Sequence, residues 1–285
     1  MSAFAKRNLK LYLRDKSALI FSLLAVFIVI GLYVLFLGDV YTNDLKEFEA
    51  AEELMDSWVM AGVLAITSMT TTLGMLGTMV NDKASGIEKD FYVAPVKRWK
   101  MGAGYMASAY LVGVVMSLIA LCVAEAYIVL NGGGYMEPWA LIRIFFAILL
   151  TSLMNTSIAL FLVSLFQSIN AYTTANIVLG TLIGFLTGIY LPIGSYPEPV
   201  QWIVKLFPVS HGALLFRNIM MKSVMDRAFD GAPVSVVKEI KEELGILYMF
   251  GDKEVTSAFC IGFMAVVAVI FFGAACLNLS RRKRG

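Results

Sequence analysis

The residues of this chain that could perform chemistry are few and scattered. His211 is the only histidine, and one histidine alone builds neither a metal site nor a proton relay. Cys122, Cys260 and Cys276 lie in apolar stretches without metal-binding spacing, so we expect them to pack as small apolar residues. No G-x4-G-K-[ST] sequence occurs, so we expect no P-loop. These patterns argue against catalysis, a metal site and a resident cofactor.

Glu125 is the only acid inside an apolar stretch, and an ionisable group at membrane depth is by default a functional candidate. Two interpretations remain open, namely an ion pair with Arg143 and contact with substrate or a proton on a translocation path. Polar residues in two later apolar stretches leave a similar choice between hydrogen bonds that join helices and contacts with cargo. These residues are Thr151, Asn155, Thr174 and Asn176.

The composition indicates the framework that must hold these residues. The chain of 285 residues is 59% hydrophobic and 15% charged, with a mean hydropathy of +0.77, which is typical of a membrane protein. Apolar stretches of about 20 residues, the length that crosses a bilayer, recur along it. We therefore predict an all-α integral membrane protein, a single transmembrane domain over residues 1–285. Its six predicted spans are residues 18–37, 58–80, 103–130, 144–166, 172–191 and 255–279.

The positions of the charges predict the orientation. The totals, 23 Lys and Arg against 21 Asp and Glu, indicate no nucleic-acid partner. Basic residues gather in segments 1–17, 81–100 and 281–284, whereas segment 38–57 is acidic. Because basic loops remain on the cytoplasmic side, we predict a multi-pass protein of the plasma membrane with both termini in the cytoplasm. The first apolar run is longer than that of a signal peptide, so we expect it to remain as a span.

Two cytoplasmic segments have patterns of their own. Residues 1–17 place basic and apolar side chains on different arcs of a helix, which is typical of an interfacial helix; a basic tail that only orients the chain is the alternative. In segment 84–95, Gly86 and Pro95 bracket a short helix with an apolar face. So short a helix needs a partner protein to persist, and a solvated charged turn is the alternative.

Segment 192–222 is apolar but is interrupted by Pro192, Pro197 and Pro208, and neither half is long enough to span. Broken helices at membrane depth need protein or a water-filled cavity around their backbone. We therefore predict a re-entrant helical hairpin on the extracellular side before the last span, with His211 stabilising its turn by a hydrogen bond. An external cap with one amphipathic helix is expected over residues 223–254.

At these residues the chain resembles the membrane subunits, or permeases, of ABC-2 type ATP-driven exporters. Three features carry the resemblance in the same order along the chain. They are the basic interfacial helix before six spans, the sequence G-x7-A-P-V-x-R from Gly86 to Arg98, and the sequence LP-x4-P…P-x2-H…R from Leu191 to Arg217.

The resemblance implies roles for two of these segments. Segment 84–95 would be the coupling helix, which in the family sits in a cleft of the ATPase subunit, and segment 192–222 would form extracellular re-entrant helices. The implied ATPase-coupling residues are Gly86, Ile87, Glu88, Asp90, Phe91, Pro95 and Arg98. The implied hairpin residues are Pro192, Pro197, Pro208, His211 and Arg217.

The same resemblance implies that the chain is not itself an enzyme. A separate ABC ATPase subunit would bind ATP and Mg²⁺, and two permease chains, identical or different, would form the path through the lipid bilayer. The family exports drugs, peptides, lipids and glycans, and no motif here chooses among them. The alternatives are a secondary transporter or channel that works without ATP and an intramembrane enzyme. The first usually needs several intramembrane charges or repeated broken helices, and the second needs clustered catalytic groups.

Overall fold

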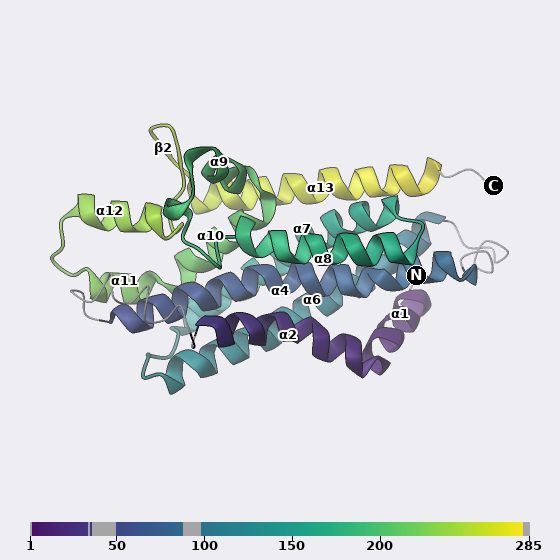
Figure 1. Cartoon of the computed structure of the whole chain (residues 1–285), viewed down its shortest axis with the longest axis horizontal. Coiled ribbons are helices and arrows are strands. Elements are labelled where there is room, and N and C mark those ends of the chain that lie inside the picture. Colours follow the sequence, from purple (N-terminus) through teal and green to yellow (C-terminus); the bar gives the residue numbers. More distant parts are fainter. Residues whose placement is uncertain (1, 34, 36–49, 88–97, 282–285) are drawn as a thin grey trace.

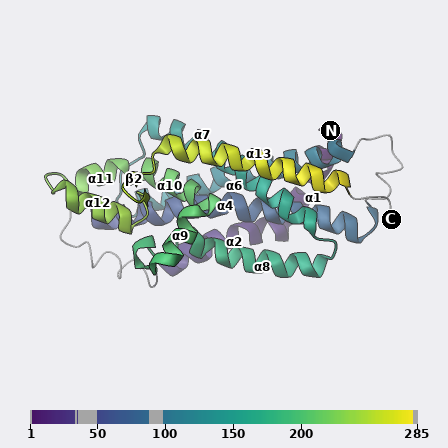
Figure 2. The same ribbon diagram turned by 90° about the horizontal axis from the view of Figure 1, so that it is seen from above.

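The computed structural model describes residues 2–33, 35, 50–87 and 98–281. Its long helices lie lengthwise beside one another and form an elongated bundle (Figure 1; Figure 2). The long helices are α2 (Lys16–Leu32), α4 (Ala51–Ala84), α6 (Arg98–Leu130), α7 (Pro138–Leu165), α8 (Ile169–Leu186) and α13 (Ser257–Arg281).

Five of the described helices, α4, α6, α7, α8 and α13, are long and apolar enough to cross a membrane. The prediction of an all-α membrane protein is therefore confirmed, with one two-residue strand pair as the exception among the described residues. The first predicted span, 18–37, overlaps α2, which has 17 residues, and residues 34, 36 and 37 of this span lie outside the described residues. The span predicted at 18–37, which would bring the total to six, therefore stays a prediction.

Helix α4 begins earlier than the apolar pattern indicated. It starts at Ala51, so Glu52, Glu53 and Asp56 lie in its first two turns rather than in a loop. Carboxylates at this end interact favourably with the helix dipole, which explains why the helix extends beyond its apolar stretch. Helix α8, expected to reach residue 191, ends at Leu186 because the chain turns at Gly188, where φ is 65°.

Helix α4 is the centre of the bundle. Of its most apolar 18 residues, 89% are buried, and α2, α6, α7, α8 and α10 pack around it. Its threonine hydroxyls bond within the helix: Thr71, for example, donates to the carbonyl of Thr67 at 2.7 Å and Thr72 to that of Ser68 at 2.7 Å. With their polar atoms satisfied, these small side chains let neighbouring helices approach closely.

Helix α6 makes its closest approach to α4 at Gly113. A Cβ atom at this position would lie 2.7 Å from Cγ2 of Thr72 and 3.7 Å from the carbonyl oxygen of Ser68. Thr72 has little freedom to yield, because it is β-branched and its hydroxyl is bonded to its own helix. Only glycine fits here without a shift of one helix.

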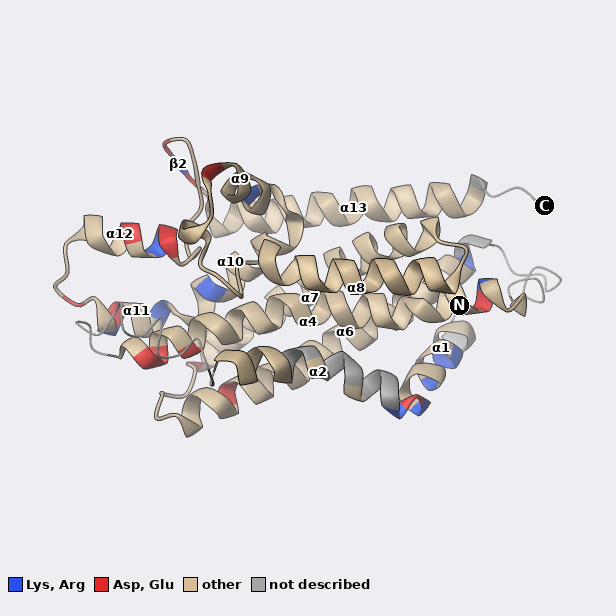
Figure 3. Ribbon diagram, viewed as in Figure 1, with Lys and Arg blue, Asp and Glu red and all other residues tan. Residues whose placement is uncertain are grey.

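Short elements cover one end of the bundle, where α4 begins (Figure 1). They are η2 (Ile193–Ser195), α9 (Glu198–Leu206), α10 (Pro208–Met220), α11 (Lys222–Ala228), α12 (Val234–Glu243), β1 (Met249–Phe250) and β2 (Lys253–Glu254). The strands pair antiparallel, with Met249 opposite Glu254. Helix α1 (Ser2–Arg14) and the end of α13 lie at the other end, and the charged residues gather at the two ends (Figure 3).

We predict that Gly113→Ala destabilises the protein, because the added methyl group forces α4 and α6 apart at a cost of about 1–3 kcal/mol. Gly74→Ala is the matched control, since Gly74 also lies in a long helix but a Cβ atom there would meet nothing within 4 Å. Thermal unfolding of the purified proteins in detergent measures the difference. Equal melting temperatures for the two variants would contradict the close contact.

Candidate functional site

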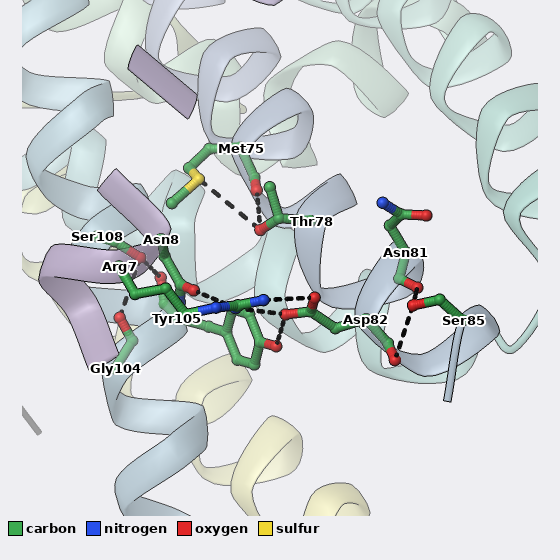
Figure 4. Close-up of polar contacts among 10 residues, drawn as sticks. All are labelled: Arg7, Asn8, Met75, Thr78, Asn81, Asp82, Ser85, Gly104, Tyr105 and Ser108. Atoms are coloured by element: carbon green, nitrogen blue, oxygen red, sulfur yellow. Dashed lines mark hydrogen bonds and ion pairs between the residues drawn. The ribbon is translucent and has the colours of Figure 1, made fainter. Parts of the chain in front are cut away.

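A cluster of polar side chains joins α1, α4 and α6 beside the predicted coupling segment (Figure 4). Asp82, in the last turn of α4, accepts two hydrogen bonds from Arg7, at 2.7 Å from Nη1 to Oδ2 and 2.9 Å from Nη2 to Oδ1. The hydroxyl of Tyr105 donates to Oδ2 of Asp82 at 2.5 Å. This two-pronged pairing is the strongest geometry available to an arginine and a carboxylate.

Apolar contacts enclose the cluster. Phe4 meets Tyr105 edge to face, with ring centroids 4.9 Å apart, and the guanidinium of Arg7 lies 5.8 Å from the centre of the Phe4 ring. Asp82 is only 4% exposed, so its carboxylate depends on these partners in place of water. The hydrogen bond that Arg7 donates to Asp82 raises the pKa of Arg7 against the opposing effect of burial, which keeps the guanidinium charged.

Sequence reasoning missed both Asp82 and Tyr105. It interpreted Arg7 only as part of a basic arc on an interfacial helix, and Lys6, Lys10 and Arg14 on that helix are indeed exposed. A carboxylate in the last turn of a helix, where the dipole disfavours it, was the available signal that Asp82 needs a cation. Nothing in the sequence connects it to Arg7, which lies 75 positions away.

The cluster sits directly before the predicted coupling segment, 84–95. Ala84, the first residue of this segment, is the last residue of α4. Of the residues that follow, Gly86 has a φ of 77° and Ile87 is 37% exposed. Glu88, Asp90, Phe91 and Pro95 lie outside the described residues, and Arg98 is the first residue of α6. The coupling helix therefore stays a prediction, and the described residues supply the two helix ends from which it departs.

The proline-broken segment consists of two short helices that meet at Phe207 and Pro208. Helix α9 has 9 residues and is largely exposed, whereas α10 has 13 residues and is almost wholly buried against α4, α7 and α13. Neither helix is long enough to cross a bilayer. Pro197 and Pro208 stand at the starts of the two helices, and Pro192 precedes η2.

His211 ties this pair of helices to α13. Its Nε2 lies 2.9 Å from the carbonyl oxygen of Lys205 at the end of α9, and its Nδ1 lies 3.5 Å from Sγ of Cys260. A carbonyl oxygen only accepts hydrogen bonds, so Nε2 carries the hydrogen and Nδ1 accepts from the Cys260 thiol. His211 therefore fixes the corner between α9 and α10.

Arg217 is buried, with 1% of its surface exposed. Its Nη2 donates to the carbonyl oxygen of Gly188 at 2.8 Å, and its guanidinium lies 4.7 Å from the centre of the Trp58 ring. Trp58 in turn donates from Nε1 to the carbonyl oxygen of Leu244 at 2.6 Å. One arginine thus fastens α10 to the turn after α8 and to α4.

Glu125 does not pair with Arg143, so that interpretation is wrong. Its Oε1 accepts a hydrogen bond from the backbone N–H of Met136 at 2.7 Å, and among the described side chains no ion pair joins the two residues. The physical reason is that the loop after α6 folds back and brings its own donor to the carboxylate. Glu125 and Arg143 nevertheless line the same cavity, of about 300 Å³.

The four polar residues predicted for a translocation path do not form one site. Asn155 is fully buried and donates from Nδ2 to Oγ of Ser68 on α4 at 2.6 Å, and Thr151 bonds to its own helix. Thr174 is exposed and Asn176 half-buried, both on α8, of which little is covered. The first two therefore join α7 to the core, and only the second pair lies on an open face.

The comparisons with known proteins agree with this architecture. The model of a family described as "ABC-2 family transporter protein" matches residues 39–277, which is most of the chain and includes four of the five candidate spans and most of the last one, α13. No curated protein matches the chain. Among the described residues, no group of three His, Cys, Asp or Glu side chains could hold a metal ion.

We predict that Asp82→Asn lowers the melting temperature, because hydrogen bonds to a charged partner contribute about 1.5–3 kcal/mol and Arg7 would lose its counter-charge. Arg7→Gln should have a similar effect, and the double variant should be no less stable than the worse single variant. Lys10→Gln, an exposed cation on the same helix, is the matched control. Simple addition of the two single effects in the double variant would contradict the pairing.

Proposed function

The chain belongs to the ABC-2 family of transporter proteins and is a transmembrane permease, and we propose that it forms the translocation path of an exporter driven by a separate ATPase chain. The observation that carries this proposal is the family match along 39–277, together with five apolar helices of spanning length. The partner ATPase would bind ATP and Mg²⁺, and this chain would convert its movement into a rearrangement of helices.

The cluster at Asp82 supports a route for that conversion. Segment 84–95 begins at the last residue of α4, two residues after Asp82, and α6 begins at Arg98, seven residues before Tyr105. A partner that pushes on this segment therefore acts on two helix ends that are already bonded to each other and to α1 through Arg7. We infer that α1, α4 and α6 respond together, as one unit.

We infer that this end of the bundle faces the cytoplasm. Helix α1 with its exposed Lys6, Lys10 and Arg14 lies at the same end of the bundle as the ends of α4 and α13 (Figure 3). Helix α2 runs from this end towards the end where α4 begins (Figure 1), which supports its role as the first of six spans. Both termini would then be cytoplasmic, as the positive-inside rule requires.

At the opposite, extracellular end, α9 and α10 would form the re-entrant hairpin. The burial of α10 against three long helices supplies the cover that a broken helix needs at membrane depth. Helices α11 and α12 and the strand pair would form the external cap over it.

A second permease chain, identical or different, would complete the path. Helix α8 offers the open face for it, because only 17% of its apolar window is buried and Ile177 and Val178 are 65% and 51% exposed. Thr174 and Asn176 would line the path on this face, where cargo passes between the two chains. No described residue selects among drugs, peptides, lipids and glycans.

A secondary transporter that works without ATP is the alternative function. Such proteins usually repeat their broken helices in both halves of the chain. In the described part of this chain the break lies in segment 192–222, after the fifth predicted span, and Glu125 is engaged by a backbone N–H group. These observations favour the ATP-driven exporter.

The coupling segment provides the test. We predict that the tagged chain, purified from its native membranes, brings down an ATPase with a P-loop, and that the purified chain alone hydrolyses no ATP. Phe91→Ala should abolish both this association and transport, since it removes the largest apolar group of the coupling segment. Membrane insertion should remain intact.

Phe146→Ala is the matched control, because Phe146 is 63% exposed on α7, inside a candidate span. Its association and transport should equal those of the wild type. Normal export by the Phe91→Ala variant would refute the coupling role, and export that persists without any ATPase would favour the secondary transporter.

A further inference from the structure

The cavity that Glu125 and Arg143 share has an unusual mixture of charges. It has a volume of about 300 Å³ and lies between α4, α6, α7 and α11 at the end proposed to be extracellular. Glu53 in its wall is already paired, since Arg227 donates to its Oε1 at 2.8 Å. Five further charged residues line the cavity, three acids and two cations, namely Glu125, Glu137, Asp226, Arg143 and Lys222.

Unlike Lys222, which is exposed, the cation Arg143 has a buried nitrogen in this cavity. Its Nε is buried and has no hydrogen-bond acceptor, and among the described residues no carboxylate lies within ion-pair distance. A buried donor without an acceptor is costly, and the planar guanidinium fits a phosphate group by two parallel hydrogen bonds. The geometry therefore calls for an anionic group in the cavity.

The acids of the same cavity add a second requirement. Glu137 and Asp226 are exposed at its rim and, within the described residues, form no ion pair. A ligand with an anion alone would face these carboxylates unfavourably, whereas an ammonium group beside the anion would complement them. The headgroup that suits the cavity is therefore zwitterionic.

An apolar groove continues from the cavity. It has a volume of about 540 Å³, runs between α6 and α7, and shares Glu125 and Tyr135 with the cavity. Its other walls are apolar, including Leu121, Ala126 and Leu141. An acyl chain attached to a headgroup in the cavity can therefore continue into the groove.

Two exposed aromatic residues indicate the depth of the cavity and the groove in the membrane. Tyr135, in the loop before α7, and Trp139, in its first turn, are 82% and 66% exposed, although both have large apolar rings. Exposed tyrosine and tryptophan of this kind gather at the level of lipid headgroups. The charged cavity would thus lie at headgroup depth and the groove beneath it among the acyl chains.

We propose that the cavity and the groove together bind one phospholipid with a phosphate and a primary ammonium in its headgroup. The phosphate lies on Arg143, the ammonium faces Glu125 and Glu137, and one acyl chain lies against Ala126. The assignment to the outer leaflet rests on the orientation proposed above, whereas the binding itself does not. The ligand of this site is therefore of the phosphatidylethanolamine type.

Titration of the full-length protein in detergent with phosphatidylethanolamine that carries a fluorescent acyl chain tests the site. Arg143→Gln should weaken binding about tenfold or more, because it removes the charged partner of the phosphate. Arg14→Gln is the matched control, since Arg14 is an exposed arginine at the opposite end. Phosphatidylglycerol, which lacks the ammonium, should bind the wild type more weakly than phosphatidylethanolamine.

Ala126→Trp provides a second, independent variant, because it fills the groove and leaves every charge in place. It should weaken phospholipid binding but leave competition by free phosphoethanolamine unchanged. Equal binding by the wild type, Arg143→Gln and Ala126→Trp would overturn the site, and equal affinity for the two lipids would overturn its ammonium selectivity. The measurement uses the permease alone, so its failure is distinguishable from failure to associate with an ATPase.

Discussion

The burial of α4 is the constraint on which the rest of the structure depends. A bilayer offers no water to satisfy polar groups, so those on a central helix must find partners within the protein. The threonine hydroxyls of α4 are satisfied by their own helix, Ser68 receives a hydrogen bond from Asn155 on α7, and Asp82 is held by α1 and α6. The bonds of Ser68 and Asp82 therefore fix the positions of α7, α1 and α6 around α4.

The two ends of α4 are fastened in different ways, and this difference suits a transmission element. At one end Asp82 forms charged hydrogen bonds beside the segment that would receive a push. At the other, Trp58 bonds to the carbonyl of Leu244 and lies beneath the guanidinium of Arg217. Because a helix is stiff along its axis, movement at the first end would, under the proposed function, reach the turn after α8 through Arg217, which bonds to Gly188.

The lengths of the apolar stretches in the sequence were enough to predict that this is a membrane protein and roughly where its long helices lie. Five spanning helices lie where long uncharged stretches occur, because burying so much apolar surface requires a membrane. The prolines of segment 192–222 likewise predicted two short helices, since proline has no backbone donor and stands at helix starts. The ends of helices were less predictable, as the acidic first turns of α4 illustrate.

The sequence did not predict which charged side chains contact each other. Glu125 and Arg143 had the right charges and neighbouring spans, yet a backbone N–H group of the intervening loop reaches the carboxylate. No pattern in the sequence pairs Arg7 with Asp82, yet they form the two-pronged ion pair that joins α1 to α4. The sequence by itself determined which stretches enter the membrane, because that depends on the local apolar area. Only the tertiary structure decided which charge meets which partner, because that depends on how distant segments pack.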